Sequence, residues 1–474
     1  MQRLLSWLRK GWRWSRTPSR RWLWYLGAAT LYVTVAFAPL EDLTPQAQGA
    51  LAVFVAAAFL WGTNTLPLAV TGILVLFLLP VSGALSQEKT YAYFGNHAVF
   101  FILGSFILAS PVMRSGLSAR LALLVVQRFG QNPKALLASV LLTPATMSFF
   151  ISEHAVAAML FPIVVELARA MGAKPGNRFG TALFLALGWG AIIGGTATLL
   201  GGARAPLALG ILQAATGSNI GFLTWLLGTF PIVLGLLLVA LVLIWKLGAD
   251  SDLHLDSARH YLGIRVQKLG PMSRREKLTI GVMLLTVSLW SFQGENWGLG
   301  TVALLGVLLA FLLKIADWRE VEEDVNWGIF LMYGSAIALS GALRDTGAAA
   351  WVAERTLSSW IEAPLFMFFA IALVSLGLTE AMSNAATVAV LMPVALAIAT
   401  EYGLDPRAVT LGVTVPAGLA FLLPVSTPAV AIVVGSGYVR PIEALRYGLW
   451  LKVMGLILLI LASQFYWPLL GLGG

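Results

Sequence analysis

A glycine-rich, polar stretch interrupts a long apolar run in the first half of the chain and decides the fold: Gly194-Gly195-Thr196-Ala197-Thr198-Leu199-Leu200-Gly201-Gly202-Ala203-Arg204-Ala205-Pro206. Apolar sequence flanks it on both sides, over residues 179–216. Glycine and proline unwind a helix, and the freed carbonyls then line a polar site or coordinate a cation. The stretch therefore predicts a helix that is broken at membrane depth. Gly188, Gly190 and Gly194 alone would instead indicate close helix packing.

Three further polar elements interrupt apolar sequence in the same way. A second broken helix is predicted over residues 406–436, at Pro424-Val425-Ser426-Thr427-Pro428. The other two are Ser152-Glu153-His154 and Ser383-Asn384-Ala385, each between two apolar segments that are short for a membrane crossing. We therefore expect two re-entrant hairpins, 135–170 and 364–400. Their tips would offer helix N-termini and free N–H groups, which suit an anion.

The two halves of the chain form an internal repeat. Gly104-Ser105 matches Gly334-Ser335, Gly116 answers Gly347, and Ser152 pairs with Ser383, with an offset that stays near 230 residues. An odd number of predicted crossings separates equivalent segments, so the halves are predicted to be inverted in the membrane. Inverted repeats with broken helices are the architecture of secondary transporters, with the site near mid-bilayer.

The composition indicates an integral membrane protein. Hydrophobic residues make up 58% and charged residues 11% of the 474 residues, with no cysteine. We expect an all-α polytopic membrane protein with about 11 transmembrane helices plus the two re-entrant hairpins. The predicted parts are an interfacial segment (1–24), a first transmembrane half (25–246), a cytoplasmic loop (247–277) and a second half (278–474). The lack of cysteine excludes thiol catalysis and disulfides.

Charge predicts the orientation. Residues 1–24 carry seven Arg or Lys and five Trp and no acid. This pattern is typical of a helix on the cytoplasmic membrane surface, and we prefer that interpretation to a nucleic-acid-binding arm. The N-terminus is then cytoplasmic, and the location is the cell inner (plasma) membrane. His254, Asp256 and His260 fall in the polar loop, and Arg344 and Asp345 at a helix end.

On these motifs the chain resembles the divalent anion/sodium symporter family, carriers of dicarboxylates, tricarboxylates and sulfate, over about residues 45–470. The family carries Ser-Asn-Thr at each hairpin tip, and the second tip here reads Glu380-Ala-Met-Ser383-Asn384-Ala385-Ala386-Thr387. It also carries a Gly-Gly-Thr-Ala-Thr run, present here from Gly194, and a Ser-Thr-Pro run, present from Ser426. The resemblance implies a scaffold and a mobile transport domain, elevator movement, a homodimer in membrane lipid, and no cofactor besides a coupling ion.

The first half departs from the family's pattern. Glu153 and His154 replace the Asn and Thr of the first tip, and Arg204 stands in the proline-rich end of the first broken helix. Ionisable groups at membrane depth are costly and usually functional. Arg204 would supply a fixed charge in place of one sodium ion, holding Glu153 or reaching the substrate. Proton coupling through Glu153 and His154, and an ion pair that only locks the hairpin, are the open alternatives.

The expected ligand is a small divalent or multivalent anion, dicarboxylate-like, with Na⁺ or H⁺ as coupling ion. Alternatives are a permease for sulfate or another oxyanion, a proton-coupled or exchange carrier, a channel, and an intramembrane enzyme; no catalytic motif supports the last. The candidate substrate-binding residues are Ser152, Glu153, His154, Thr196, Thr198, Arg204, Ser383, Asn384, Thr387, Ser426, Thr427 and Pro428. The candidate cation-coupling residues are Ser152, Glu153, Gly195, Ser383, Asn384, Glu380 and Ser426, with sodium expected at Ser383, Asn384 and Ser426.

Overall fold

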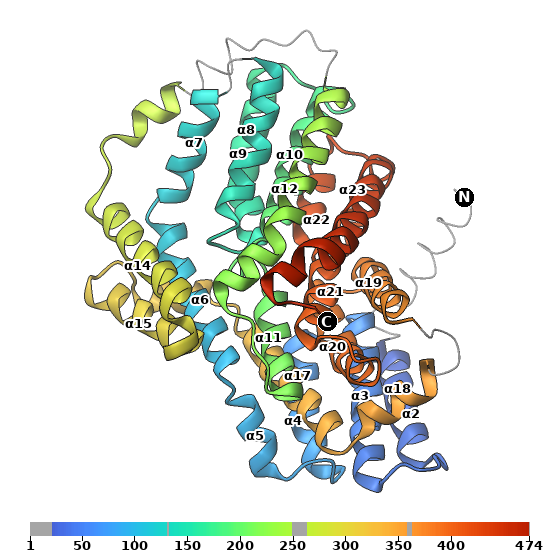
Figure 1. The fold of residues 1–474 in the computed structure, drawn as a ribbon. Coiled ribbons are helices and arrows are strands. Elements are labelled where there is room, and N and C mark those ends of the chain that lie inside the picture. Colours follow the sequence, from blue (N-terminus) through green and yellow to red (C-terminus); the bar gives the residue numbers. More distant parts are fainter. Residues whose placement is uncertain (1–20, 130–131, 249–262, 358–362, 474) are drawn as a thin grey trace.

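A computed structural model describes residues 21–129, 132–248, 263–357 and 363–473, and these residues form helices and turns with no strand among them (Figure 1). The basic segment before residue 21 and the loop histidines lie outside the described residues. The first half contains α2 (Arg21–Phe37), α3 (Pro45–Thr63), α4 (Leu68–Val81), α5 (Gln87–Phe94), α6 (His97–Arg114), α7 (Leu117–Phe129), α8 (Pro133–Met147), α9 (Glu153–Ala170), α10 (Arg178–Gly194), α11 (Arg204–Thr216) and α12 (Phe222–Leu247).

From α3 onward, the second half follows the order of long and short helices of the first. It contains α14 (Arg274–Trp297), α15 (Leu299–Leu312), α16 (Trp318–Asp324), α17 (Trp327–Asp345), α18 (Ala348–Leu357), α19 (Pro364–Ala381), α20 (Asn384–Glu401), α21 (Pro406–Gly418), α22 (Pro428–Gly435) and α23 (Pro441–Leu461), then a π turn (Ala462–Tyr466) and a 3₁₀ turn (Trp467–Leu470). Asp345 ends α17, as expected for a residue at a helix end.

Six helical stretches among the described residues are long and apolar enough to cross a membrane, and a seventh is added if the bent pair α16–α17 counts as one span. Four shorter apolar helices accompany them. The all-helical, multi-pass fold is thus confirmed, while the expected number of crossings stays a prediction. The helices α19 and α20 have 18 residues each and pass this length test, so the expectation that both are too short to cross is wrong on length.

Polar residues begin the helices as the sequence chemistry dictates. Asn, Ser, Thr and Asp side chains accept a backbone N–H at the start of most long helices, as Thr44 does for α3 and Ser86 for α5. Proline occupies the first turn of several, where its missing N–H costs no hydrogen bond. These starts are Pro45, Pro133, Pro364, Pro406, Pro428 and Pro441.

The two halves interleave instead of lying side by side. Helix α4 packs along α17, α6 along α15, and α11 against both α17 and α20. Two matched ion-pair clusters tie the halves crosswise. Arg114, at the end of α6, binds Asp324 of α16 at 2.7 Å, and Arg344, 230 positions later at the end of α17, binds Asp345 and Tyr93 of α5. Each arginine precedes a glycine with positive φ, Gly116 (85°) and Gly347 (80°), which turns the chain into α7 or α18.

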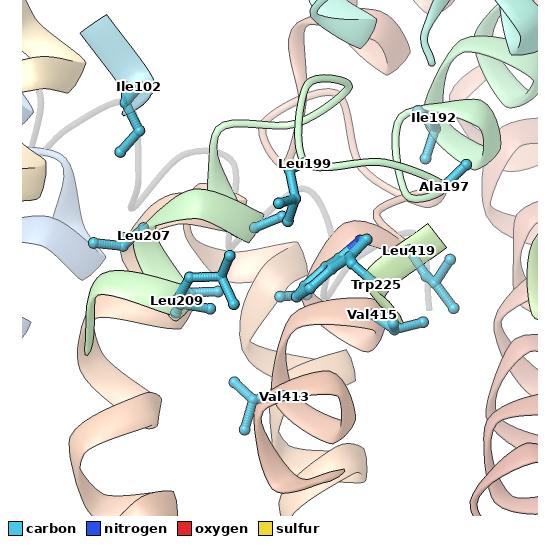
Figure 2. Close-up of a cluster of buried hydrophobic side chains, with 14 of the residues drawn as sticks. Ile102, Ile192, Ala197, Leu199, Leu207, Leu209, Trp225, Val413, Val415 and Leu419 are labelled. Atoms are coloured by element: carbon cyan, nitrogen blue, oxygen red, sulfur yellow. The ribbon is translucent and has the colours of Figure 1, made fainter. Parts of the chain in front are cut away.

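Helix α10 is buried along its length from Phe179 to Gly194 and forms the centre of one end of the molecule. It packs closely on α8: a Cβ at Gly190 would lie 2.1 Å from the Leu141 carbonyl oxygen, and one at Gly194 would lie 2.1 Å from that of Ala145. The glycines before the break therefore serve close packing, as their spacing alone suggests. Figure 2 shows Leu199, Trp225, Val415 and Leu419 in the apolar cluster below the break.

The α8–α10 contact predicts a position-dependent effect of adding one methyl group. Gly194→Ala should lower the free energy of unfolding by about 1–3 kcal/mol, because the methyl meets backbone that has no room to move. Gly377→Ala in α19 is the matched control, since a Cβ there meets no atom within 4 Å; alanine's higher helix propensity should leave it neutral or slightly more stable. Thermal unfolding in detergent measures both, and equal stability of the two variants would contradict the packing.

Candidate functional site

A buried ion pair lies where the first hairpin tip meets the first helix break. The Arg204 guanidinium donates to the Glu153 carboxylate at 3.0 Å and to the Thr196 hydroxyl at 2.8 Å. The side chains of Glu153 and Arg204 are 1% and 3% exposed. A buried charge is tolerated only with a partner and further hydrogen bonds, and both are present here. This contact belongs to two of the three interpretations left open by the sequence, a fixed charge in place of sodium and a pair that locks the hairpin.

Glycines make the space that the two charged groups occupy. A Cβ at Gly195 would lie 2.1 Å from the Glu153 carboxylate, and a Cβ at Gly418 would lie 2.4 Å from Arg204 Nε. At Gly202 the added carbon would lie 2.3 Å from the guanidinium. Backbone from both breaks therefore approaches the pair so closely that any side chain at these glycines would displace it. The pair fills a slot built by both halves.

The second hairpin tip is connected to the same pair. The Asn384 amide donates to the Glu153 carboxylate at 3.4 Å, across 231 positions of sequence. The Thr379 hydroxyl lies 2.9 Å from the Asn384 oxygen and 2.6 Å from the Ala417 carbonyl oxygen, which ties this asparagine to the end of α21. The two tips and both breaks thus meet around one carboxylate.

The two tips differ in how they begin their helices. Ser383 accepts the N–H of Ala386 and caps α20, whereas Ser152 makes no such bond at the start of α9. Glu153 instead donates its own N–H to the Gly201 carbonyl at 2.9 Å, which fixes the tip to the break. Ser152 lines a small cavity of about 30 Å³ together with Ser105 of α6. The second tip keeps the ordinary capping chemistry that the first has lost.

His154 has more solvent access than the other residues whose side chains contact one another around the pair. Its side chain is 39% exposed, and Nδ1 lies 3.8 Å from a Glu153 carboxylate oxygen. The same nitrogen lies 3.5 Å from the hydroxyl of Thr427, which caps α22. His154 therefore connects the charge pair to the second break.

The first break is held by hydroxyl groups. Thr198 donates to the Phe149 carbonyl at 2.7 Å, so the break is fastened to the first hairpin. From α12, Thr229 donates to the Ala197 carbonyl at 2.9 Å, and the Trp225 indole reaches the Thr196 carbonyl at 3.5 Å. The sequence analysis missed Trp225 and Thr229, because nothing in an apolar helix marks which residues face a distant loop.

The second break is held differently. Ser426 donates to the Leu423 carbonyl at 2.6 Å, and Pro428 starts α22. Glu380 accepts three backbone N–H groups, from residues 421 to 423, and pairs with Lys452 of α23 at 2.7 Å. Its contacts are therefore to backbone and to a lysine that the sequence analysis did not single out.

The predicted residues fall into two groups. Those joined by side-chain contacts around the pair are Glu153, His154, Thr196, Arg204, Asn384 and Thr427, with Gly195 against the carboxylate. Those that shape the surrounding backbone are Ser152, Thr198, Ser383, Thr387, Glu380, Ser426 and Pro428.

A separate cavity of about 330 Å³ between α11, α17, α18 and α20 contains none of the predicted residues. Within the described ranges no three His, Asp or Glu side chains are grouped to hold a metal ion.

Comparison with known proteins supports a transporter. Residues 19–472 match the family model described as "Sodium:sulfate symporter transmembrane region". The chain is 29% identical over 470 residues to the sodium-dependent dicarboxylate transporter SdcS of Staphylococcus saprophyticus, covering 94% of this chain and 90% of the relative. It is 27% identical over 471 residues to SdcS of Staphylococcus aureus, with the same coverage.

Two solved transporters share the fold. The Alcanivorax borkumensis YdaH transporter matches with a TM-score of 0.53 and 16% identity, over 79% of this chain and 86% of that one. Neisseria gonorrhoeae MtrF matches with a TM-score of 0.54 and 15% identity, over 79% and 83%. At such identities the similarity concerns the fold alone.

The buried pair predicts non-additive stability. Glu153→Gln or Arg204→Gln alone should destabilise by about 3–5 kcal/mol, because each leaves an uncompensated buried charge. The double variant removes both charges and should recover much of that loss.

Arg169→Gln in the exposed Arg169–Glu166 pair is the control, expected to cost at most about 1 kcal/mol. Thermal unfolding in detergent compares the four variants. Additive losses in the double variant would show that the two groups do not act as a pair.

Proposed function

Because the chain belongs to the sodium:sulfate symporter family of membrane transporters, we propose that it is a secondary active carrier of a small multivalent anion, a dicarboxylate or a sulfate-like oxyanion. One observation carries this proposal. Four helices, α9, α11, α20 and α22, begin at the site, and their first residues are linked through Glu153, His154, Arg204, Asn384 and Thr427. Each helix N-terminus presents roughly half a positive charge and free N–H groups, which is the environment that an anion needs.

A fixed cation at the first tip supports a changed role for sodium there. The Arg204 guanidinium stays charged at physiological pH and already fills the slot between Gly202 and Gly418. A sodium ion there would meet a fixed cation at close range. We therefore infer that Arg204 replaces one coupling sodium, so that transport depends less on the sodium gradient.

The second tip keeps the groups expected of a sodium site. Ser383 and Asn384 stand at the second tip and Ser426 in the second break, and Asn384 has an amide oxygen that accepts from the Thr379 hydroxyl. Oxygen ligands of this kind suit a hard cation such as sodium. We propose that any remaining sodium coupling resides here, with one ion fewer than two symmetric tips would hold.

We propose that transport proceeds by an elevator movement of the hairpins against a scaffold. The turns at Gly116 and Gly347, each after an arginine anchored to the opposite half, support pivots at the start of α7 and α18. We further propose a homodimer in the inner membrane, on the basis of the family resemblance. The basic N-terminal segment supports a cytoplasmic N-terminus.

Proton coupling is the second candidate, favoured by the partly exposed His154 beside Glu153. A histidine near a carboxylate is suited to exchange protons near neutral pH. This candidate requires that an inward proton gradient drive uptake in the wild type and that Glu153→Gln abolish the effect. If the uptake rate does not depend on the proton gradient, or if the Glu153→Gln variant still responds to that gradient, proton coupling through Glu153 is excluded. Exchange or residual sodium coupling then remains as the energy source.

Sodium dependence tests the proposed role of Arg204. Purified protein in proteoliposomes should take up radiolabelled succinate or sulfate, and replacing sodium by choline should reduce the rate less than about tenfold, equivalent to 1.4 kcal/mol. A cooperative sodium dependence of uptake, as two coupling ions would give, would contradict the replacement of sodium by Arg204. Absence of uptake of either anion would contradict the substrate class.

Restoring the family's chemistry should restore sodium dependence. The double variant Glu153→Asn with Arg204→Ala removes the pair and leaves an amide and an empty slot for a cation. Its uptake should rise at least about tenfold between sodium-free and sodium-rich buffer. The matched control is Glu166→Asn with Arg169→Ala, a double change in an exposed pair of α9 that should leave the sodium response of the wild type unaltered.

A further inference from the structure

A second buried ion pair lies behind the second break, away from the Glu153–Arg204 pair. Lys452 of α23 binds a Glu380 carboxylate oxygen at 2.7 Å and the Leu376 carbonyl at 2.6 Å. Both residues are nearly buried, at 4% and 8% exposed. Neither pairs with the site residues, so the role of this pair follows from what Glu380 holds.

Glu380 holds the backbone of the second break. After α21 ends at Gly418, the chain leaves the helix and three successive N–H groups lack helical partners. Glu380 accepts all three: those of Phe421 and Leu422 at 3.1 and 3.2 Å on one oxygen, and that of Leu423 at 3.0 Å on the other. A carboxylate with several N–H donors is strongly fixed in place. The position of the break is thus set by one side chain.

This fixation reaches the site through a short series of contacts. Leu423 is held by Glu380, and its carbonyl accepts the hydroxyl of Ser426 at 2.6 Å. The next residue, Thr427, caps α22 and contacts His154. A shift of the backbone at Leu423 would therefore move Ser426 and Thr427 away from the pair and the helix N-termini.

At the corresponding place in the first half, no acid accepts successive backbone N–H groups among the described residues. Ser152 and Ser383 are 231 positions apart, and by the same register Phe149 stands where the second hairpin has Glu380. The Phe149 carbonyl accepts the Thr198 hydroxyl, and Thr229 holds Ala197. The ionic arrangement is specific to the second break within the part of the chain that the structure describes.

We propose that Lys452 and Glu380 are positioning residues that hold the second break in the geometry needed to bind the transported anion. Glu380 supplies the acceptors, and Lys452 neutralises and orients it. The proposal rests on the proposed function in one respect, since it takes the second break as part of the anion site.

The test separates positioning from mere stability. Lys452→Met leaves the buried Glu380 carboxylate without its cation, and Glu380→Gln leaves the buried Lys452 without its anion, so each should lower thermal stability. The double variant carries neither charge and should regain most of the lost stability. A glutamine has a single acceptor oxygen, so at least one of the three N–H groups loses its partner. The double variant should therefore raise KM for succinate or sulfate uptake at least about tenfold while Vmax stays within about threefold.

Lys452→Arg preserves the charge and should keep KM near the wild-type value. A double variant with recovered stability and wild-type KM would overturn the positioning role. So would a Lys452→Met variant that folds and transports with unchanged KM, since Glu380 would then need no partner.

A second readout does not depend on transport. The chain has no cysteine, so Val425→Cys, in the second break and 43% exposed, can be labelled alone with a maleimide. The Glu380→Gln/Lys452→Met background should speed this labelling, and leave unchanged that of Leu200→Cys in the first break. Equal labelling rates at Val425→Cys in both backgrounds would overturn the positioning role. Absence of uptake of both anions by the wild type is a separate result, and it would refute the proposed function.

Discussion

The contact between Glu153 and Arg204 is the constraint on which the centre of the molecule depends. A carboxylate with almost no solvent access needs a partner, and the guanidinium is its closest one. To place that partner, α10 ends at Gly194, the chain unwinds over residues 195–203, and α11 begins with the arginine itself. Glycines from both breaks leave the slot open, and Asn384 brings the second tip to the same carboxylate. The meeting of both halves at one point follows from the need to compensate one buried charge.

The halves place their buried charges differently. In the first half the pair is at the hairpin tip, where a ligand would meet it, and hydroxyl groups hold the break. In the second half the tip is neutral, and the pair Glu380–Lys452 lies behind the break and holds it. Two buried pairs in related halves thus have opposite positions relative to the site. The halves thus differ in the charge at one tip and in the support of the break at the other, while they share the order of helices from α3 onward.

The contacts also limit how the proposed movement can occur. Glu153 joins α9 to α11 through Arg204 and to α20 through Asn384, so the two hairpins are connected through the site. Any displacement of one hairpin that preserves these bonds carries the other with it. The packing of α4 on α17 and of α6 on α15, together with the arginine contacts between the halves, joins these four helices. The turns at Gly116 and Gly347 join α6 to α7 and α17 to α18.

Much of this arrangement was determined by sequence alone. Long apolar runs with few charges require helices in a membrane, and glycine, proline and capping residues predict breaks at 194–206 and 424–428, because backbone propensities are local. The ends of α9 and α20 follow from the same rules, and so does the choice of Glu153, Arg204 and Asn384 as unusual polar residues. Tertiary structure alone decided which partners they take. The Asn384–Glu153 contact spans 231 positions, and Lys452, Trp225 and Thr229 face the breaks from helices whose local sequence is that of any membrane segment. A side chain's partner across the fold depends on helix rotation and packing, which no local pattern encodes.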